Sequence, residues 1–123
     1  MDNYKRYTEL AVWIEARKLV SLIYTTTKLF PKDELFSLVS QLRRCAVSIP
    51  SNIAEGCGRN HTKDTLQFLY ISRGSLYELE TQIYLSIDLK YIDEETLNIT
   101  LNQIETVRKL LNGFMKYYYK LDS

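Results

Sequence analysis

The stretch QLRRCAVSIPSNIAEGCGRN, residues 41–60, decides the fold, because its apolar residues keep a helical spacing across a proline. One apolar helix face, with steps of four and three residues, is formed by Leu42, Ala46, Ile49 and Ile53. Pro50 lies within this pattern, where a proline removes a backbone hydrogen bond and bends a helix. The alternative is a helix that breaks at Ile49. Because the apolar phase persists from Ile49 to Ile53, we predict one continuous, proline-kinked helix.

The flanking sequence extends this pattern into a single all-α domain covering residues 1–123. Only four Gly and two Pro occur in 123 residues, which favours long helices over a turn-rich β-protein. Apolar periodicity predicts four helices joined by short connectors, at about residues 9–29, 32–56, 63–89 and 94–119. Asp93 is expected to cap the last helix, and the glycines after the second helix to end it in a left-handed conformation. The sequence therefore predicts an up-down antiparallel four-helix bundle.

Two of these helices carry more apolar surface than one bundle needs. The second helix has its apolar sector widened to about 200° by Phe36, Val47, Pro50 and Ala54. The third helix has a second apolar side formed by Ile71, Leu85 and Leu89. Gly74 lies in the middle of that helix, and we expect a close neighbouring helix to explain it. Monomers rarely expose large apolar patches, so we predict self-association; the alternative is a bundle wrapped by its own tyrosine-rich termini.

A polar sector occupies the rest of the second helix. Its aligned members are Arg44, Ser48, Asn52 and Glu55. Most of these residues are small or uncharged, so two interpretations stay open: a solvated face, or a polar seam between helices or subunits. Glu78 and Glu80 of the third helix complete the proposed seam, as candidate partners of Arg43 and Arg44.

The residue inventory argues against an enzyme. His61 is the one histidine, which removes most acid–base and triad designs and the Glu-x-x-His pairs of di-iron bundles. Cys45 and Cys57 are twelve residues apart on one predicted helix, about 18 Å, too far for a disulfide. We therefore expect no catalytic residue, metal site or cofactor. The chain contains neither a long apolar span nor a signal-peptide layout, which predicts a cytoplasmic protein that does not enter a membrane.

Two segments closely resemble the four helix bundle proteins known as 23S rRNA-intervening-sequence proteins: SQLRRCAVSIPSNIAEGCGRN and FLYISRGSLYELETQIYLSIDLKYI. The resemblance also includes the segments ELAVWIEARKLV and FPKDELFSLVSQ and covers nearly the whole chain. Cys57 departs from the pattern, since an aromatic residue often stands between those glycines. The resemblance implies an up-down bundle that assembles into a ring, typically a pentamer. A strongly basic relative works with RNA in diversity-generating retroelements, whereas the formal net charge of this chain is +1.

The function predicted on these grounds is a non-enzymatic homo-oligomer that associates with ribosomal or other RNA. Its candidate RNA- or partner-binding residues are Arg43, Arg44, Arg59, Lys63 and Arg73. The competing interpretation of these residues is a salt-bridged surface. Stacking platforms or core filling are the two roles open to Tyr4, Tyr7, Tyr117, Tyr118 and Tyr119. The alternative function is a ring-forming scaffold or adaptor that binds an unidentified protein partner without nucleic acid.

Overall fold

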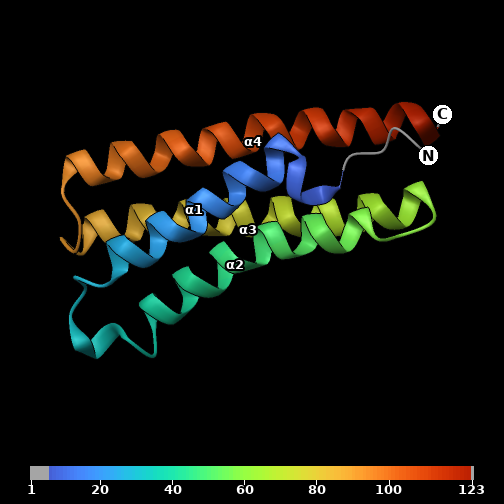
Figure 1. Cartoon of the computed structure of the whole chain (residues 1–123). Coiled ribbons are helices and arrows are strands. Elements are labelled where there is room, and N and C mark those ends of the chain that lie inside the picture. The colour runs from blue at the N-terminus through green and yellow to red at the C-terminus, as the bar shows by residue number, and fades with distance from the viewer. Residues whose placement is uncertain (1–5, 123) are drawn as a thin grey trace.

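The computed structural model describes residues 6–122, whose regular structure is helical throughout. The four α-helices are α1 (Ala11–Thr27), α2 (Leu38–Cys57), α3 (Thr62–Asp88) and α4 (Glu94–Asp122). Short 3-10 turns, Tyr7–Glu9 and Lys32–Glu34, precede α1 and α2. Figure 1 shows the helices running alternately up and down, which confirms the predicted all-α four-helix bundle.

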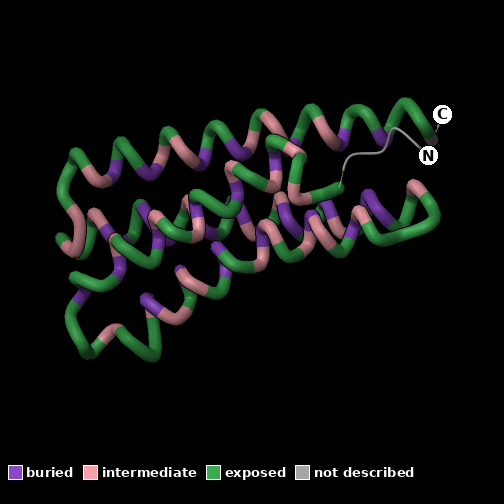
Figure 2. The backbone as a smooth tube through the Cα atoms, viewed as in Figure 1, coloured by how far each residue is buried: buried purple, intermediate pink, exposed green. Residues whose placement is uncertain are grey.

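Each helix packs against its neighbours along the chain, and α1 closes the ring of helices against α4. The buried residues follow the inner stripe of every helix, as Figure 2 shows. The fully buried side chains include one layer after another of branched residues: Leu19, Ile23, Leu42, Ile49, Leu69, Leu76, Ile83, Ile104 and Leu111. This arrangement leaves the connectors at the two ends and the outer helix faces available for function.

Helix α2 runs through Pro50 without a break, as the unbroken apolar phase predicts. Its start was placed wrongly, because the helix begins at Leu38 and not near residue 32. A 3-10 turn covers Lys32–Glu34, and Ser37 has a non-helical backbone with φ −125° and ψ −98°. A Glu34 carboxylate oxygen accepts hydrogen bonds from the Ser37 hydroxyl (2.9 Å) and the Leu38 amide (3.3 Å). Helix α2 therefore starts at Leu38, whose amide has no carbonyl acceptor within the helix and donates to the Glu34 carboxylate instead.

The connection between α3 and α4 is a tight C-terminal cap. Lys90 has φ 65°, and the amides of Lys90 and Tyr91 donate to the carbonyls of Ile87 and Ser86, each at 2.9 Å. This is the Schellman arrangement, with lysine where glycine is the usual residue. The Thr96 amide then donates to the Asp93 carboxylate at 2.8 Å, which confirms Asp93 as the cap of α4.

The α2–α3 contact is the most extensive in the bundle, and Gly56 explains its closeness. A Cβ built on Gly56 would lie 3.1 Å from the Thr65 carbonyl oxygen and 3.2 Å from the Phe68 Cβ. The Thr65 hydroxyl also donates to the Gly56 carbonyl at 2.8 Å. Two expectations were wrong here: no described glycine has a positive φ, and Gly74 has no neighbouring atom within 4 Å of its Cβ position. Close packing requires Gly56, whereas Gly74 faces outward.

Candidate functional site

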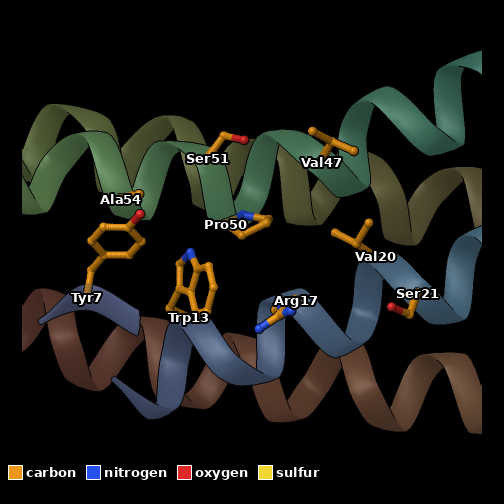
Figure 3. Close-up of a pocket in the computed structure, with 9 residues that line it drawn as sticks. All are labelled: Tyr7, Trp13, Arg17, Val20, Ser21, Val47, Pro50, Ser51 and Ala54. Carbon is orange, nitrogen blue, oxygen red and sulfur yellow. The ribbon is translucent and has the colours of Figure 1, made fainter. Parts of the chain in front are cut away.

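A hollow of about 470 Å³ lies between α1 and α2, and we call it the α1/α2 groove. Figure 3 shows aromatic and cationic side chains of the α1 side opposite the proline turn of α2. The groove is lined by Tyr7, Trp13, Arg17, Val20, Ser21, Val47, Pro50, Ser51 and Ala54. These include three of the four residues that widen the apolar sector of the second helix in the sequence. The groove thus contains apolar residues of α2 that do not pack into the core of the same chain.

A second hollow continues the groove past Val47 toward the α1–α2 connection. There the side chain of Phe36 is almost fully exposed, with 91% of its surface open to solvent. Arg43 is held on this side, because its Nε donates to the Thr27 hydroxyl at 3.0 Å and its guanidinium lies 4.6 Å from the centre of the Tyr24 ring. The whole side is apolar and aromatic, with fixed arginines along it.

Helix α3 presents a separate apolar face. Ile71, Leu85 and Leu89 are exposed there, which confirms the second apolar side expected for this helix. Exposed apolar side chains thus lie along the α1/α2 groove and along α3, and a further hollow between α1 and α4 is lined by Leu22, Leu29 and Ile99.

The predicted polar seam divides into two parts. Ser48 and Asn52 are half-buried against α3, where the hydroxyls of Ser48 and Ser75 share a hydrogen bond of 2.8 Å. The Asn52 amide nitrogen donates to the Ser48 carbonyl at 2.8 Å. Arg44 and Glu55, in contrast, are exposed. Small polar groups therefore fill the α2–α3 contact, and the charged residues of the set point outward.

The two glutamates named with the seam do not share one partner. Glu80 pairs with Arg108 of α4, with 2.9 Å between Nη2 and Oε2, rather than with Arg43 or Arg44. Glu78 is exposed and lies close enough to Cys45 to act on its thiol electrostatically. Burial raises the pKa of the Cys45 thiol to about 11, and the Glu78 charge acts in the same direction. Cys45 is therefore protonated at neutral pH and a poor nucleophile.

The five predicted basic residues do not form one patch. Arg43 and Arg44 lie in the first half of α2, and Arg59 follows its end, about 22 Å further along the helix axis. Arg59 pairs with Glu55 at 3.0 Å and covers the Phe68 ring, with 4.5 Å to its centre. Lys63 is exposed at the start of α3. Arg73 turns toward α4, where its Nη1 donates to the Asn112 side-chain oxygen at 3.2 Å.

Sequence reasoning missed the lysines of α4, although the sequence carries a signal for them. The charged residues of α4 up to Glu105 are all acidic, and those from Arg108 to Lys120 are all basic. Of the predicted stacking tyrosines, Tyr118 is buried in the core, whereas Tyr7, Tyr117 and Tyr119 are exposed. Tyr4 lies outside the described residues. The order of charge along one helix, combined with aromatic residues, marks this region.

Within residues 6–122, no helix has the length and apolarity needed to cross a membrane. The same part of the chain holds no group of three or more His, Cys, Asp or Glu residues placed to bind a metal ion.

Comparisons with known proteins agree with this architecture. No curated protein sequence matches the chain. A crystal structure of a protein with unknown function from the S23 ribosomal protein family of Bacteroides thetaiotaomicron VPI-5482 superimposes with a TM-score of 0.77. That protein is 24% identical, and the match covers 85% of this chain and 95% of that one, which shows a shared fold. The model of the family described as 23S rRNA-intervening sequence protein matches residues 8–113. The chain therefore belongs to the 23S rRNA-intervening sequence protein family.

Proposed function

We propose that this protein is a non-enzymatic, self-associating helical bundle whose subunits join through the α1/α2 groove. The observation that carries the proposal is the groove itself: a 470 Å³ apolar hollow that continues into a second hollow lined by the almost fully exposed side chain of Phe36. Exposing a large apolar side chain costs about 1.5–3 kcal/mol relative to burying it. A second copy of the chain is the partner that is always present at the same concentration.

A closed ring requires two different surfaces on each subunit, because a head-to-tail contact joins unlike faces. The α1/α2 groove and the α3 residues Ile71, Leu85 and Leu89 are two such surfaces. The charges of the two faces are also complementary, with Arg17 and Arg43 on the groove side and Glu78 between Ile71 and Leu85. The proposed number of subunits, five, rests on the family resemblance.

Light-scattering mass of the purified protein, with and without nuclease, tests assembly. We expect a mass several times that of one 14.5 kDa chain. Val47→Glu places a charge in the groove and should reduce that mass, since an unpaired charge is costly to bury in an interface. The matched control is Ile99→Glu, which changes another exposed apolar residue (52%, against 40% for Val47) in the hollow between α1 and α4, away from both faces. A wild-type monomer at micromolar concentration, or equal effects of the two substitutions, would contradict assembly through the groove.

A second candidate function is association with RNA. It is supported by the family description and by the basic half of α4, which faces solvent beside exposed tyrosines. Repetition of a modest site around an oligomer would strengthen weak contacts through multivalency. RNA that remains bound at about 50 mM salt and dissociates at about 200 mM would support phosphate contacts. A defined protein that co-purifies without RNA at low salt would instead favour the adaptor alternative.

A further inference from the structure

The surface made by α3 and α4 is electrically divided along its length. Because the two helices are antiparallel, the first half of α3 lies beside the second half of α4 (Figure 1). The basic end carries Lys63, Arg73, Lys109, Lys116 and Lys120, together with the acidic Asp64. Arg108 lies at the boundary, where it pairs with Glu80 and Glu105. The opposite half carries Glu80, Asp88, Asp93, Glu94, Glu95 and Glu105, with Lys90 as its one cation among the described residues. A chain with a formal net charge of only +1 therefore concentrates positive charge at one place.

Complementing the helix dipole explains only part of this distribution. That effect is limited to the first and last turns, so it accounts for Glu94, Glu95 and Lys120. Lys109 and Lys116 are four and two turns or so from the end of α4, and Arg73 is in the middle of α3. Lys63 even lies in the first turn of α3, where a positive charge is unfavourable. Helix stability therefore leaves most of the basic end unexplained.

Exposed tyrosines border the lysine row on both sides. At 100° per residue, Lys109, Lys116 and Lys120 share the outer face of α4, with about 10.5 Å and 6 Å between successive positions. Tyr117 lies on one edge of this face, toward α1, and Tyr119 on the other, toward α3. Interleaved cations and aromatic rings are the composition of surfaces that bind single-stranded nucleic acid.

The edge nearest α3 is held in place before any ligand arrives. The hydroxyls of Tyr70 and Tyr119 share a hydrogen bond of 2.9 Å, and their ring centres are 6.4 Å apart. The Arg73 guanidinium lies 5.7 Å from the centre of the Tyr70 ring and donates to Asn112 at 3.2 Å. Fixed rings lose little freedom when a base stacks on them, which favours binding.

Gly113 is an independent indication from the same face. It lies within α4 between Lys109 and Lys116, and a Cβ built on it would meet no atom within 4 Å. A glycine inside a helix costs about 1 kcal/mol relative to alanine. Packing within the chain does not account for this cost, whereas close approach of a ligand backbone to the helix would.

We propose that the basic tyrosine stripe, formed by Tyr70, Arg73, Lys109, Gly113, Lys116, Tyr117 and Tyr119, binds single-stranded nucleic acid. Lysines and Arg73 contact phosphates, the tyrosines stack on unpaired bases, and Gly113 lets the strand approach the helix. Duplex is disfavoured because its bases are already stacked and are not available to the rings. The inference rests on the proposed association with RNA and specifies where it occurs.

Fluorescence anisotropy with a labelled single-stranded RNA of about 20 nucleotides, longer than ordinary single-strand site sizes, tests the stripe. The double variant Lys109→Gln/Lys116→Gln should lose about 20-fold in affinity near 0.1 M salt and reduce the salt slope by about 1.4, since each single-strand phosphate contact contributes about 0.7. The matched control is Lys28→Gln/Lys32→Gln, which removes two exposed lysines at the other end of the bundle and should change affinity less than about threefold.

Two further variants separate stacking and close approach from charge. Tyr117→Leu should weaken binding about tenfold, within the range measured for base–aromatic stacking. Its control is Tyr84→Leu, an equally exposed tyrosine at the acidic end of α3. Gly113→Leu keeps every charge and favours the helix, so a loss of binding would come from blocked approach. Thermal unfolding of each variant checks that the fold is retained.

The outcomes distinguish the stripe from the general association with RNA. RNA binding that is insensitive to both Lys109→Gln/Lys116→Gln and Tyr117→Leu would overturn the stripe and leave the association standing. No binding by the wild type at about 50 mM salt would overturn both. Equal binding of a duplex, or displacement of RNA by polyglutamate at equal charge, would overturn the single-strand assignment.

Discussion

The two sides of α2 differ in packing: one side packs closely against α3, and the other faces an open groove next to α1. Toward α3 the helix presents small residues. Gly56 packs closely against the Thr65 backbone, and the Ser48 hydroxyl shares a hydrogen bond of 2.8 Å with that of Ser75. Toward α1 it presents Val47 and Pro50 across an open groove. On the first side the missing side chains bring two backbones together. On the side that faces α1, α2 does carry side chains, but α1 does not cover them.

The difference shows how to separate residues that hold the bundle together from residues available to a partner. Ser72 is fully buried and donates to the Ile49 carbonyl at 2.9 Å, so this polar side chain on the α2–α3 side has its partner within the chain. The groove side leaves apolar surface in water at a cost that a second subunit would remove. Substitutions on the first side should change the stability of the fold, and those on the second side should change assembly.

The largest expected effect comes from adding the same kind of bulk on each side. Gly56→Val should destabilise the fold by about 2–3 kcal/mol, because the new side chain would overlap the Thr65 carbonyl and Phe68. Ala54→Val, which lines the groove, should cost less than about 1 kcal/mol, mostly through helix propensity. Urea unfolding at two protein concentrations measures both and separates folding from assembly. Equal free energies of unfolding for the two variants would remove the distinction between the sides.

Pro50→Ala should have the next largest effect, and in the opposite direction. Alanine supplies the missing amide donor in the middle of α2 and relieves the proline clash, so the fold should gain about 1–2 kcal/mol. The same substitution removes a ring from the groove and should lower the light-scattering mass. A more stable protein with reduced assembly would indicate that the proline serves the interface. A destabilised Pro50→Ala variant would contradict this interpretation.

The smallest effect concerns a hydrogen bond between two connectors at one end of the bundle. The Tyr91 hydroxyl donates to the Glu34 carboxylate at 2.7 Å and ties the α1–α2 connection to the α3–α4 connection. This bond, followed by those from Ser37 and Leu38, lowers the pKa of Glu34, and Glu34 in turn raises the pKa of Tyr91. Tyr91→Phe should therefore lower the melting temperature modestly near neutral pH.

The difference in melting temperature between wild type and Tyr91→Phe should depend on pH, because the pKa of Glu34 is lowered and the pKa of Tyr91 is raised. A lowered carboxyl pKa stabilises above the unfolded value, about 4.3, and the benefit disappears as pH falls through the folded pKa. A raised tyrosine pKa stabilises below the unfolded value, about 10, and the benefit disappears as pH rises through the folded pKa. The gap between wild type and Tyr91→Phe should be widest between about pH 5 and 9. A gap that stays constant down to about pH 3 would argue against the carboxylate hydrogen bond.

The fold was predictable because apolar spacing survives through every helix, including the turn around Pro50. The errors came from backbone choices that spacing does not encode. Leu35 and Phe36 continue the apolar pattern of α2, yet Ser37 leaves the helical conformation and Glu34 caps a later start. Gly56 was expected to end a helix by its left-handed freedom, whereas its missing side chain serves a contact with a distant segment.

The candidate site was predictable only in part. The excess apolar residues of α2 and α3 were visible on a helical wheel, because exposure there follows directly from periodicity. The sequence did not show which arginines have hydrogen-bond partners, because those partners lie on other helices. Arg43 donates to Thr27 of α1, and Arg73 donates to Asn112 of α4. The lysines of α4 needed the antiparallel pairing with α3 before they formed a surface with Tyr70.

The division of charge along α3 and α4 gives each subunit a permanent electric moment along the bundle axis. If subunits assemble around a ring in the same direction, these moments add, and the ring has one cationic rim and one anionic rim. At low ionic strength the cationic rim of one such ring would attract the anionic rim of another. At about 0.1 M salt, where the Debye length is about 10 Å, this attraction would be screened and the rings would separate. The formal net charge of +1 conceals this polarity entirely.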